Sequence, residues 1–508
     1  MIFHDENVKR LDLTRSDDVQ KLIEFHLCGH TALSELAPSD RKLLDEFVTK
    51  AMPAGVTFQQ FNELLLVLNQ DRVSRAFFEF FFGNADLQVP FARLQEGVVR
   101  FKGFAIVCFG NFRFAFRRLS KIDDLASLRE ELGFCCQSED EALQRYSTRA
   151  EKILDVELIS RDHSWFVGEI TGRVLSKELT NFEKYREENP KQSQDDEVLS
   201  FAKALQEMDR SFEQVQEAAL RNTDVYLTWD HLDVYVATSM RNKWEYEEVF
   251  DFVDKLFRSP VLTPMKLRYF DPTQSKCRTS RDKGLLEGLM LKRAYCTIYM
   301  AQETDTLGKD SELANTLAQG KPVIAYVPQV NAASYSRIIQ DRPLQFAKQR
   351  LLHLLSLGMF DDVDDMRRLA HNFLEDLAAY RKAQPCELWS ERDTKEFKRA
   401  KEYWVPLCDG IAKAEEKAFD RRAAILQQFH PLGMQMNLKT GVANGVLVIR
   451  SAERCADLLK AILTNKAEFD FKVDEGGQVL VERNSESVFR AVTNNEKLTN
   501  SFWNLWTQ

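Results

Sequence analysis

The segment Glu303–Pro328 holds the acidic residues of this chain that are best placed for chemistry. An acidic loop with Glu303 and Asp305 follows one apolar stretch. A short helix with Glu312 comes next, and Gly320-Lys321-Pro322 ends that helix and begins a second apolar stretch. If the two stretches are parallel strands, their carboxyl ends open on the crevice where such sheets hold ligands. The segment therefore predicts a carboxylate aimed at a ligand.

Glu312 is the acid of this segment for which we expect a chemical role. Asp310 or Ser311 is expected to cap the helix, which places Glu312 in its first turn, where the helix dipole favours an ionised carboxylate. Such a carboxylate in a cleft can stabilise an oxocarbenium-like sugar cation or attack it covalently, so cleavage of an N-glycosidic bond fits this position. The alternative is an acid that only complements the dipole.

Polar residues also follow two other predicted strands. Ser239, Arg241 and Asn242 come after the first strand, and Asp271 comes after the second. Hydroxyl, guanidinium and carboxylate groups there can bind ribose and phosphate. We expect Arg241 to lie near a phosphate or ribose, Ser239 to help bind it, and Asp271 and Asp305 to orient ribose hydroxyls. The alternative for each is the ordinary polarity of a solvated loop.

The elements that must position these residues alternate between strand and helix. The expected strands are 233–239, 266–272, 295–302 and 323–327. The expected helices are 245–258, 281–293 and a short one that begins near residue 311. Such alternation predicts right-handed βαβ units and a parallel sheet, so the fold class is α/β.

The region at about 221–335 resembles the group of α/β domains that comprises Toll/interleukin-1 receptor (TIR) domains and nucleoside deoxyribosyltransferases. The strand Asp233–Ser239 is similar to the opening strand of TIR domains. The segment from Glu312 to Pro322 is similar to the deoxyribosyltransferase segment in which a nucleophilic Glu precedes Gly-Lys-Pro by the same interval. The resemblance covers about one fifth of the chain. It implies a flavodoxin-like fold, with Glu312 acting on a ribosidic bond.

Three functions follow as expectations from this resemblance. Enzymatic TIR domains cleave NAD at its nicotinamide, which makes NAD the expected substrate and implies no separate cofactor. The multidomain setting resembles bacterial anti-phage effectors, in which a sensor region restrains a TIR-like NADase, and it implies a homo-oligomer or a defence-system partner. The alternatives are a nucleoside or deoxynucleotide N-glycosidase or base-transfer enzyme, and a non-catalytic TIR-like module that binds a nucleotide or a partner.

Composition shifts along the chain predict six regions. They are a helical N-terminal region (1–95), a mixed α+β region (96–184), a linker with a connecting helix (185–220), the TIR-like domain (221–335), a helical region (336–425) and a small α/β module (426–508). Within these regions we expect a polar linker at 185–196, a helix at 201–220 and a hairpin at 469–482. In the mixed region we expect strands at 98–101 and 104–109, a strand at 112–117 with period-two alternation, and a helix at about 139–155.

Three further patterns deserve a chemical interpretation. His26-Leu-Cys28-Gly-His30 places two histidines four residues apart, but no second cluster completes four ligands, so no metal site is expected. The stretch Phe112–Arg118 mixes aromatic residues with arginines, as a strand that stacks bases and holds phosphates would, or as a half-buried strand with a basic outer face. Glu287 is an isolated acid in an apolar helix, expected on a solvated flank or near the same crevice as Glu312.

Composition limits the class of protein. The 508 residues are 44% hydrophobic and 29% charged, as in ordinary globular proteins, and the net charge of −9 lacks the overall basic character of most nucleic-acid-binding proteins. No basic leader precedes an apolar run, and no apolar stretch approaches membrane-spanning length, so neither a signal peptide nor membrane binding is expected. Nine cysteines without a CxxC pair suggest reduced thiols, and we expect a cytoplasmic location.

Overall fold

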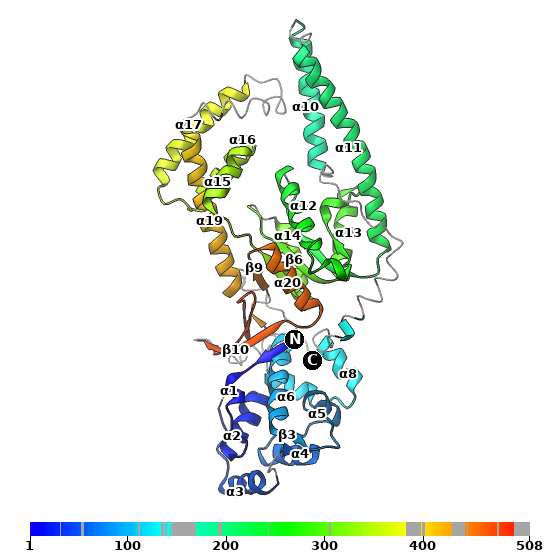
Figure 1. Cartoon of the computed structure of the whole chain (residues 1–508), viewed down its shortest axis with the longest axis vertical. Helices are drawn as coiled ribbons and strands as arrows, with labels where there is room; N and C mark the ends of the chain where they lie inside the picture. The colour runs from blue at the N-terminus through cyan, green and yellow to red at the C-terminus, as the bar shows by residue number, and fades with distance from the viewer. Residues whose placement is uncertain are drawn as a thin grey trace.

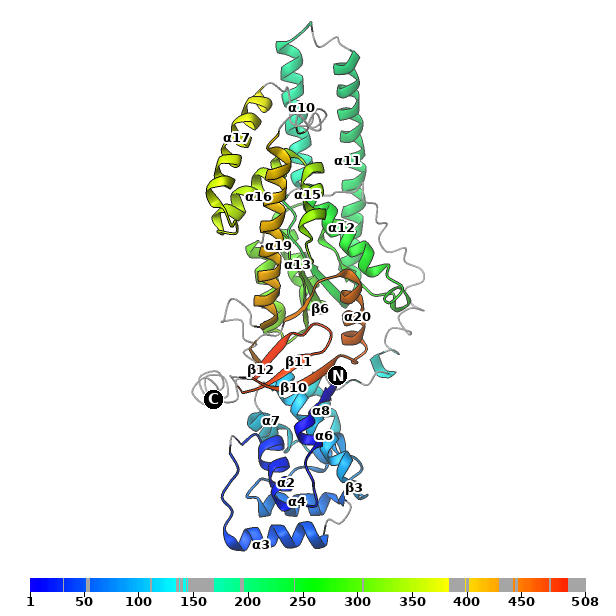
Figure 2. The same cartoon turned by 60° about the vertical axis from the view of Figure 1, so that its left-hand side comes forward.

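A computed structural model describes most of the chain. The described residues are 1–133, 169–382, 402–428 and 442–491, together with 137, 140–142, 144 and 398. Within these ranges the structure does not describe residues 31, 52–54, 110–111, 192–195, 242, 304–305, 444–445 and 475–476. The molecule is elongated, with the N-terminal helices at one end and a long helical hairpin at the other (Figures 1 and 2). Most of the helix expected at 139–155 lies outside the described residues.

A five-stranded parallel sheet forms the centre of the molecule, as the alternation of strand and helix predicted. Its strands are β4 (Leu232–Ala237), β5 (Tyr269–Phe270), β6 (Ala294–Met300), β7 (Val323–Tyr326) and β9 (Val446–Ile449). Their order is β5-β4-β6-β7-β9, and every neighbouring pair is parallel. All six residues of β4 are buried, as expected of a strand covered on both faces.

Helices cover both faces of this sheet. On one face Val234, Val236 and Ile298 pack against α12 (Lys243–Phe257) and α20 (Ala452–Leu463). On the other face Tyr235 and Tyr299 pack among residues of α13 (Ser280–Arg293), α14 (Leu307–Ala318), the end of α11 (Asp196–Thr228) and α19 (Trp404–Gln428). Neighbouring residues of one strand therefore belong to opposite cores.

A helical lobe lies in the chain between β7 and β9. It consists of α15 (Ala332–Asp341), α16 (Leu344–Ser356), α17 (Val363–Lys382) and the first part of α19, and it has a core of its own. The helices expected in 336–425 are present in its described part. The strand β9 lies beyond this lobe and pairs with β7, so the central sheet draws its fifth strand from the region 426–508.

A pair of long helices projects from the body. The helices are α10 (Glu169–Glu188) and α11, and they pack against each other side by side (Figures 1 and 2). The expectation of a polar linker at 185–196 is wrong for its first part, because α10 continues to Glu188. The expected helix at 201–220 is confirmed and is longer at both ends.

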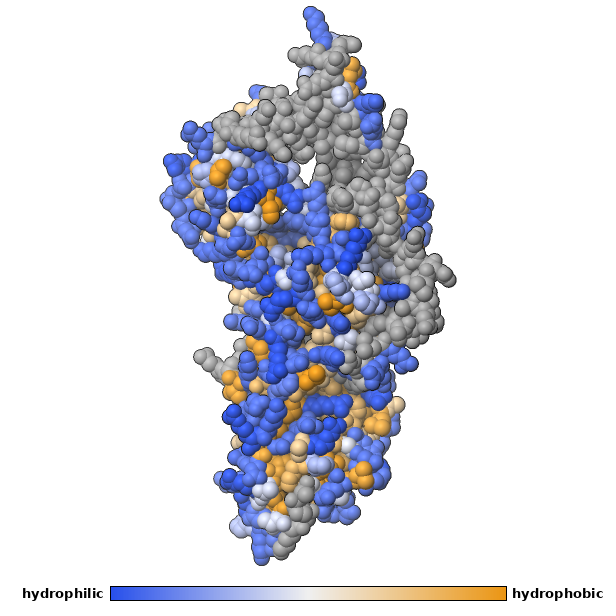
Figure 3. Space-filling model, in the orientation of Figure 1, coloured by the Kyte–Doolittle hydropathy of each residue, from blue (hydrophilic) through white to orange (hydrophobic). Residues whose placement is uncertain are grey.

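The N-terminal region is helical, as predicted. Its helices are α1 (Glu6–Lys9), α2 (Ser16–Gln20), η1 (Lys21–Leu27), α3 (Pro38–Glu46), η2 (Phe47–Ala51), α4 (Phe58–Val67) and α5 (Arg75–Phe81), and β2 (Gly55–Val56) pairs with β3 (Val89–Pro90). Phe77, Phe78, Phe81 and Phe82 are buried in its core. In Figure 3 hydrophobic residues gather most visibly over this end of the molecule.

The three strands expected between residues 98 and 117 are wrong. The chain there forms α6 (Phe91–Phe104), η3 (Ala105–Phe109) and α7 (Phe112–Leu119), followed by α8 (Leu125–Leu132). The buried residues of α7 are Phe112, Ala115, Phe116 and Leu119, a helical spacing that the local alternation of Phe and Arg concealed. Because Phe112 and Phe116 are buried, they cannot stack on bases.

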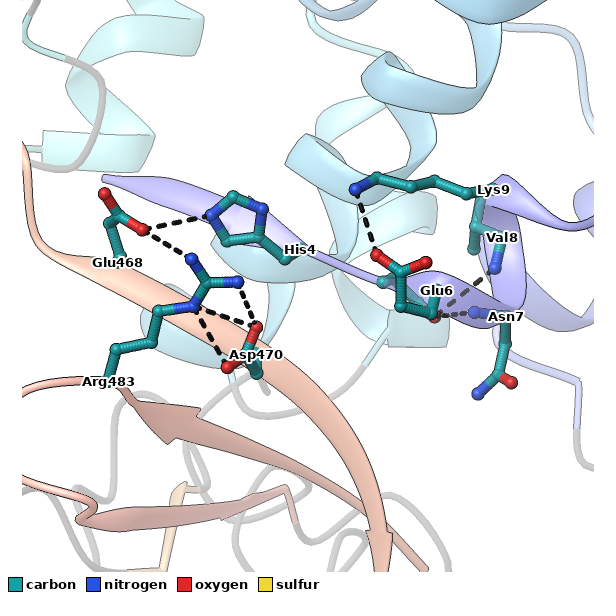
Figure 4. Close-up of polar contacts among 9 residues, drawn as sticks. His4, Glu6, Asn7, Val8, Lys9, Glu468, Asp470 and Arg483 are labelled. Atoms are coloured by element: carbon teal, nitrogen blue, oxygen red, sulfur yellow. Dashed lines mark hydrogen bonds and ion pairs between the residues drawn. The ribbon is translucent and has the colours of Figure 1, made fainter.

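A second sheet joins the two ends of the described chain. Its strands lie in the order β1 (Ile2–His4), β10 (Glu468–Asp474), β11 (Gly477–Glu482), β12 (Val488–Ala491) and β8 (Val442–Ala443). The hairpin expected at 469–482 is confirmed, and β1 adds to it as a parallel neighbour of β10. Arg483 binds Glu468 and Asp470 beside β1, where His4 Nε2 lies 3.4 Å from Glu468 (Figure 4).

Candidate functional site

Glu312 lies in the second turn of α14, so its expected place in the first turn is wrong. The helix begins at Leu307, and the Thr306 hydroxyl caps it by accepting the backbone N–H of Lys309 at 3.1 Å. Neither Asp310 nor Ser311 is the cap. The reason is that Thr306 offers a capping hydroxyl several residues earlier. The dipole of the first turn therefore does not explain the state of Glu312, and its surroundings must.

The sheet presents a hydroxyl group to Glu312. The Tyr235 hydroxyl donates to Glu312 Oε1 at 2.8 Å. Tyr235 lies within β4 and is fully buried, and its ring stacks on that of Phe270 at 5.4 Å between centroids. Burial and this stacking fix the direction of the Tyr235 side chain, so β4 holds a hydrogen-bond donor against the carboxylate of α14.

Burial sets the protonation of Glu312. It raises the pKa of this carboxyl from 4.5 to about 7, while the hydrogen bond from Tyr235 lowers the pKa, the charge of Glu287 raises it, and Lys283 and Lys309 lower it. Near neutral pH a group of this kind is divided between its acid and carboxylate forms. A half-buried carboxyl with such a pKa suits proton transfer, and a nearby cation shifts it toward the carboxylate.

Glu287 of α13 shares the surroundings of Glu312. It is half-buried, burial raises its pKa, and Lys283 Nζ lies 3.8 Å from its Oε1. Its charge also raises the pKa of Tyr235 and of Cys277, so it lies near both. Of the two expectations for Glu287, the structure therefore favours the position near Glu312. The sequence signal was an isolated acid within an otherwise apolar helix.

The ends of β4 and β6 are joined to each other. The backbone N–H of Ser239 donates to Gln302 Oε1 at 2.5 Å, and Gln302 Nε2 donates to the carbonyl of Ser239 at 3.2 Å. Ser239 is buried, whereas Arg241 is exposed and its backbone N–H donates to the carboxylate of Glu245. The two residues thus lie at the carboxyl end of β4 as predicted, with Ser239 part of a bridge between strands.

The helical lobe packs against this same edge. The Tyr335 hydroxyl of α15 donates to Glu303 Oε1 at 2.7 Å, directly after β6. Arg342 forms an ion pair with Glu247 and lies 3.7 Å from Glu248, both on α12. The pKa of Glu248 is raised well above its ordinary value by burial and by Glu303, against the effect of Arg342. The strand ends therefore form an interface with the lobe.

Asp271 shapes the loop after β5. It is fully buried, and its Oδ1 accepts the Thr273 backbone N–H at 2.9 Å and the Thr273 hydroxyl at 2.7 Å. This bond caps the short helix η7 (Pro272–Gln274). Asp305 and Asn242 lie outside the described residues.

The expected site residues lie in two different places. The contacts of Glu312 are on the α13–α14 face of the sheet, while those of Ser239 are at the strand ends.

Basic residues that the prediction did not single out lie at the start of α13. Arg278, Arg281 and Lys283 are exposed, and Thr279 caps the helix that follows. Exposed guanidinium and ammonium groups can hold phosphate groups. The signal was available as the basic run from Lys276 to Lys283.

The first histidine of the pair, His26, has a structural explanation. His26 Nδ1 lies 3.0 Å from Lys102 Nζ, and Lys102 forms a buried ion pair with Asp5. Burial, then the charge of Lys102, lowers the pKa of His26 to about 3. Across the part of the chain that the structure describes, no group of three or more potential ligands could hold a metal ion, and no helix is both long and apolar enough to cross a membrane.

Comparison of the chain with protein-family models, with curated proteins and with solved structures found no match.

Proposed function

We propose that the central sheet and its helices form a TIR-like domain that cleaves a nucleotide N-glycosidic bond, with NAD as substrate. The strand order supports the flavodoxin-like part of this proposal. Numbered along the chain, the five strands lie in the order 2-1-3-4-5, the order of flavodoxin-like sheets. In that arrangement α14 follows the third strand and carries Glu312.

The hydrogen bond between Tyr235 and Glu312 is the observation that carries the proposal. It fixes one oxygen of a half-buried carboxyl whose pKa is about 7. When nicotinamide leaves NAD, positive charge develops on the ribose ring. The carboxylate of Glu312 would stabilise that charge or form a covalent ester until water or an internal adenine nitrogen captures the sugar. The positive charge of bound NAD would itself favour the ionised form of Glu312.

Exposed basic residues after β4 and at the start of α13 support a substrate with phosphate groups. Arg278 and Arg281 are exposed at the start of α13, and Arg241 is exposed after β4. A pyrophosphate held by these guanidinium groups would leave the nicotinamide ribose free to approach Glu312. The lobe and the N-terminal region would then restrain the enzyme or assemble it with further copies or with a defence-system partner, because unrestrained loss of NAD harms a cell.

A second substrate class is favoured by the pKa of Glu312. Nicotinamide leaves NAD as a neutral molecule, whereas the base of an ordinary nucleoside leaves more readily when an acid protonates it. A carboxyl with a pKa of about 7 retains a proton part of the time at neutral pH. The alternative to an NADase is therefore a nucleoside or deoxynucleotide N-glycosidase.

Product analysis separates these possibilities. Purified protein is incubated with NAD, with AMP and with a deoxynucleoside, and the released bases are measured by chromatography. The proposal predicts nicotinamide from NAD. Release of adenine alone supports the nucleosidase, and release of no base under conditions that assemble the protein, such as forced oligomerisation, contradicts both. Ser311→Ala, an exposed change next to Glu312, is the control for substitutions in α14.

A further inference from the structure

The loop between β5 and α13 is held by the helix α11. Asn222 Nδ2 donates to the carbonyl of Gln274 at 2.9 Å. Thr223 Oγ1 donates to the carbonyl of Lys276 at 2.8 Å and accepts the backbone N–H of Lys276 at 3.1 Å. The Lys276 N–H also lies 3.2 Å from the carbonyl of Ala219. Backbone groups of the loop thus find their partners on α11.

These bonds are sheltered from water. Asn222 is 9% exposed and Thr223 is 8% exposed. A buried backbone group that loses its partner cannot easily replace it with solvent, so Asn222 and Thr223 restrict the positions open to the loop. Lys276 makes a further contact with α11. Its Nζ binds the side chain of Gln216, which lies more than one helical turn before Asn222.

The same loop also packs against the core next to Glu312. Cys277 packs against the core that contains Tyr235 and Leu313, and the charge of Glu287 raises the pKa of its thiol. Phe270, directly before the loop, stacks on Tyr235. Thr279, directly after Arg278, caps the helix that carries Lys283 and Glu287. The loop therefore lies against the core that contains Tyr235, the hydrogen-bond partner of Glu312.

We propose that Asn222 and Thr223 are positioning residues, which hold the loop from Asp271 to Cys277 in the place where it packs against the core around Tyr235, the hydrogen-bond partner of Glu312. The importance of that contact for activity rests on the proposed function. Because α11 continues into the projecting hairpin (Figure 1), the same two residues connect the hairpin to the loop. A force that rotates or shifts α11 would then move the loop directly, with no other described helix between them.

The test compares Thr223→Val and Asn222→Leu with wild type in the full-length protein. Hydrogen exchange of the amides of Thr273–Lys276 and the rate of Cys277 alkylation report on the loop, and neither requires turnover. We expect both rates to rise about tenfold in each variant, as loss of one buried hydrogen bond permits. Thr223→Ser, which keeps the hydroxyl, is expected to restore wild-type rates. Arg221→Gln, exposed on the same helix, is the matched control.

Turnover of NAD adds a functional readout. For an active enzyme we expect Thr223→Val and Asn222→Leu to raise KM more than they lower kcat, because a displaced loop changes the surroundings of the substrate before it affects Glu312. Unchanged loop exchange and Cys277 alkylation in both folded variants would overturn the proposal. A wild-type protein that turns over no nucleotide refutes the proposed function alone, since the loop measurements still decide the role of α11.

Discussion

Two carboxylates from the same short segment, Glu303 and Glu312, end in opposite kinds of surroundings. Each accepts a hydrogen bond from a tyrosine hydroxyl, Glu303 from Tyr335 at 2.7 Å and Glu312 from Tyr235 at 2.8 Å. Tyr335 belongs to the helical lobe, whereas Tyr235 belongs to the sheet itself. The bond of Glu303 therefore fastens two parts of the molecule together, and that of Glu312 orients a side chain within one part.

The charges around the two residues sharpen this difference. Near Glu303 lie Glu248, Arg342 and the buried pair of Arg350 with Glu415, so the strand ends form an ionic interface. Near Glu312 the charged groups are Glu287, Lys283 and Lys309, and the exposed Arg278 and Arg281 lie at the start of the same helix as Glu287. The lobe packs against the strand ends, whereas Glu312 is a half-buried residue next to α13. The comparison favours Glu312 as the reacting group.

Arg350→Met should have the largest effect on stability. It leaves Glu415 buried without its partner, and we expect a loss of about 3–5 kcal/mol in the free energy of unfolding at pH 8. The loss should be smaller at pH 6, because the pKa of Glu415 is already raised by burial to about 7 and rises further without Arg350. Urea denaturation at both pH values measures it.

Arg368→Gln is the control, since its ion pair with Asp365 is exposed and is expected to contribute less than about 1 kcal/mol. If Arg350→Met and Arg368→Gln destabilise the protein equally, the buried pair of Arg350 with Glu415 does not stabilise the lobe in the way described above.

Glu312→Gln should stabilise the protein at high pH. The pKa of Glu312 is about 7 in the folded state against an ordinary 4.5, so between these values the folded state binds more protons than the unfolded state. Wild-type stability therefore falls as pH rises from 4.5 to 7 on account of this group. We expect Glu312→Gln to be more stable than wild type by about 1–3 kcal/mol at pH 8 and no more stable at pH 4.5. Thermal unfolding across this pH range shows whether the gain appears.

Tyr235→Phe and Tyr335→Phe separate the two tyrosines by their effect on activity. Without its hydroxyl donor, Glu312 loses an interaction that lowers its pKa, so Tyr235→Phe should move the titration of Glu312 to higher pH and reduce kcat about tenfold or more at neutral pH. Tyr335→Phe should leave kcat within about threefold of wild type unless the lobe restrains the enzyme, in which case kcat rises. Equal losses in the two variants would mean that the strand-end edge belongs to the reaction.

Arg278→Gln should have the smallest effect. An exposed guanidinium that holds a phosphate contributes modestly, so we expect KM for NAD to rise about threefold to tenfold with little change in kcat. The wild-type KM should rise with added salt, and the variant should respond less. An identical salt response in both proteins would remove Arg278 from the binding surface.

The sequence predicted the central sheet because its signal is local. Buried strands such as 295–302, separated by helices, can be recognised from their own residues, and so could the helix that carries Glu312. The pairing of β9 with β7, and of β1 with β10, joins segments far apart in the chain, and no local pattern indicates such pairing. The helix α7 was missed because alternating Phe and Arg also fit a strand over a few residues.

The candidate site was predicted only in part. The position of Glu312 relative to Gly320 could be read from the chain, but its partner Tyr235 appeared there only as one aromatic residue in a buried strand. In the sequence Asp271 resembled a ligand-binding carboxylate, whereas in the structure it caps η7. The reason is that Thr273 offers two hydrogen-bond donors, and accepting from them stabilises the buried carboxylate. Which acid meets a ligand depends on burial, and burial is set by the whole fold.

The most direct test of the central claim is nicotinamide release by Glu312→Gln and Glu303→Gln at equal concentrations of protein. If Glu312 is the reacting carboxylate, Glu312→Gln should release nicotinamide at least about a thousandfold more slowly than wild type, while Glu303→Gln stays within about tenfold. Glu312→Gln with wild-type activity, or with a loss no greater than that of Glu303→Gln, would contradict the account.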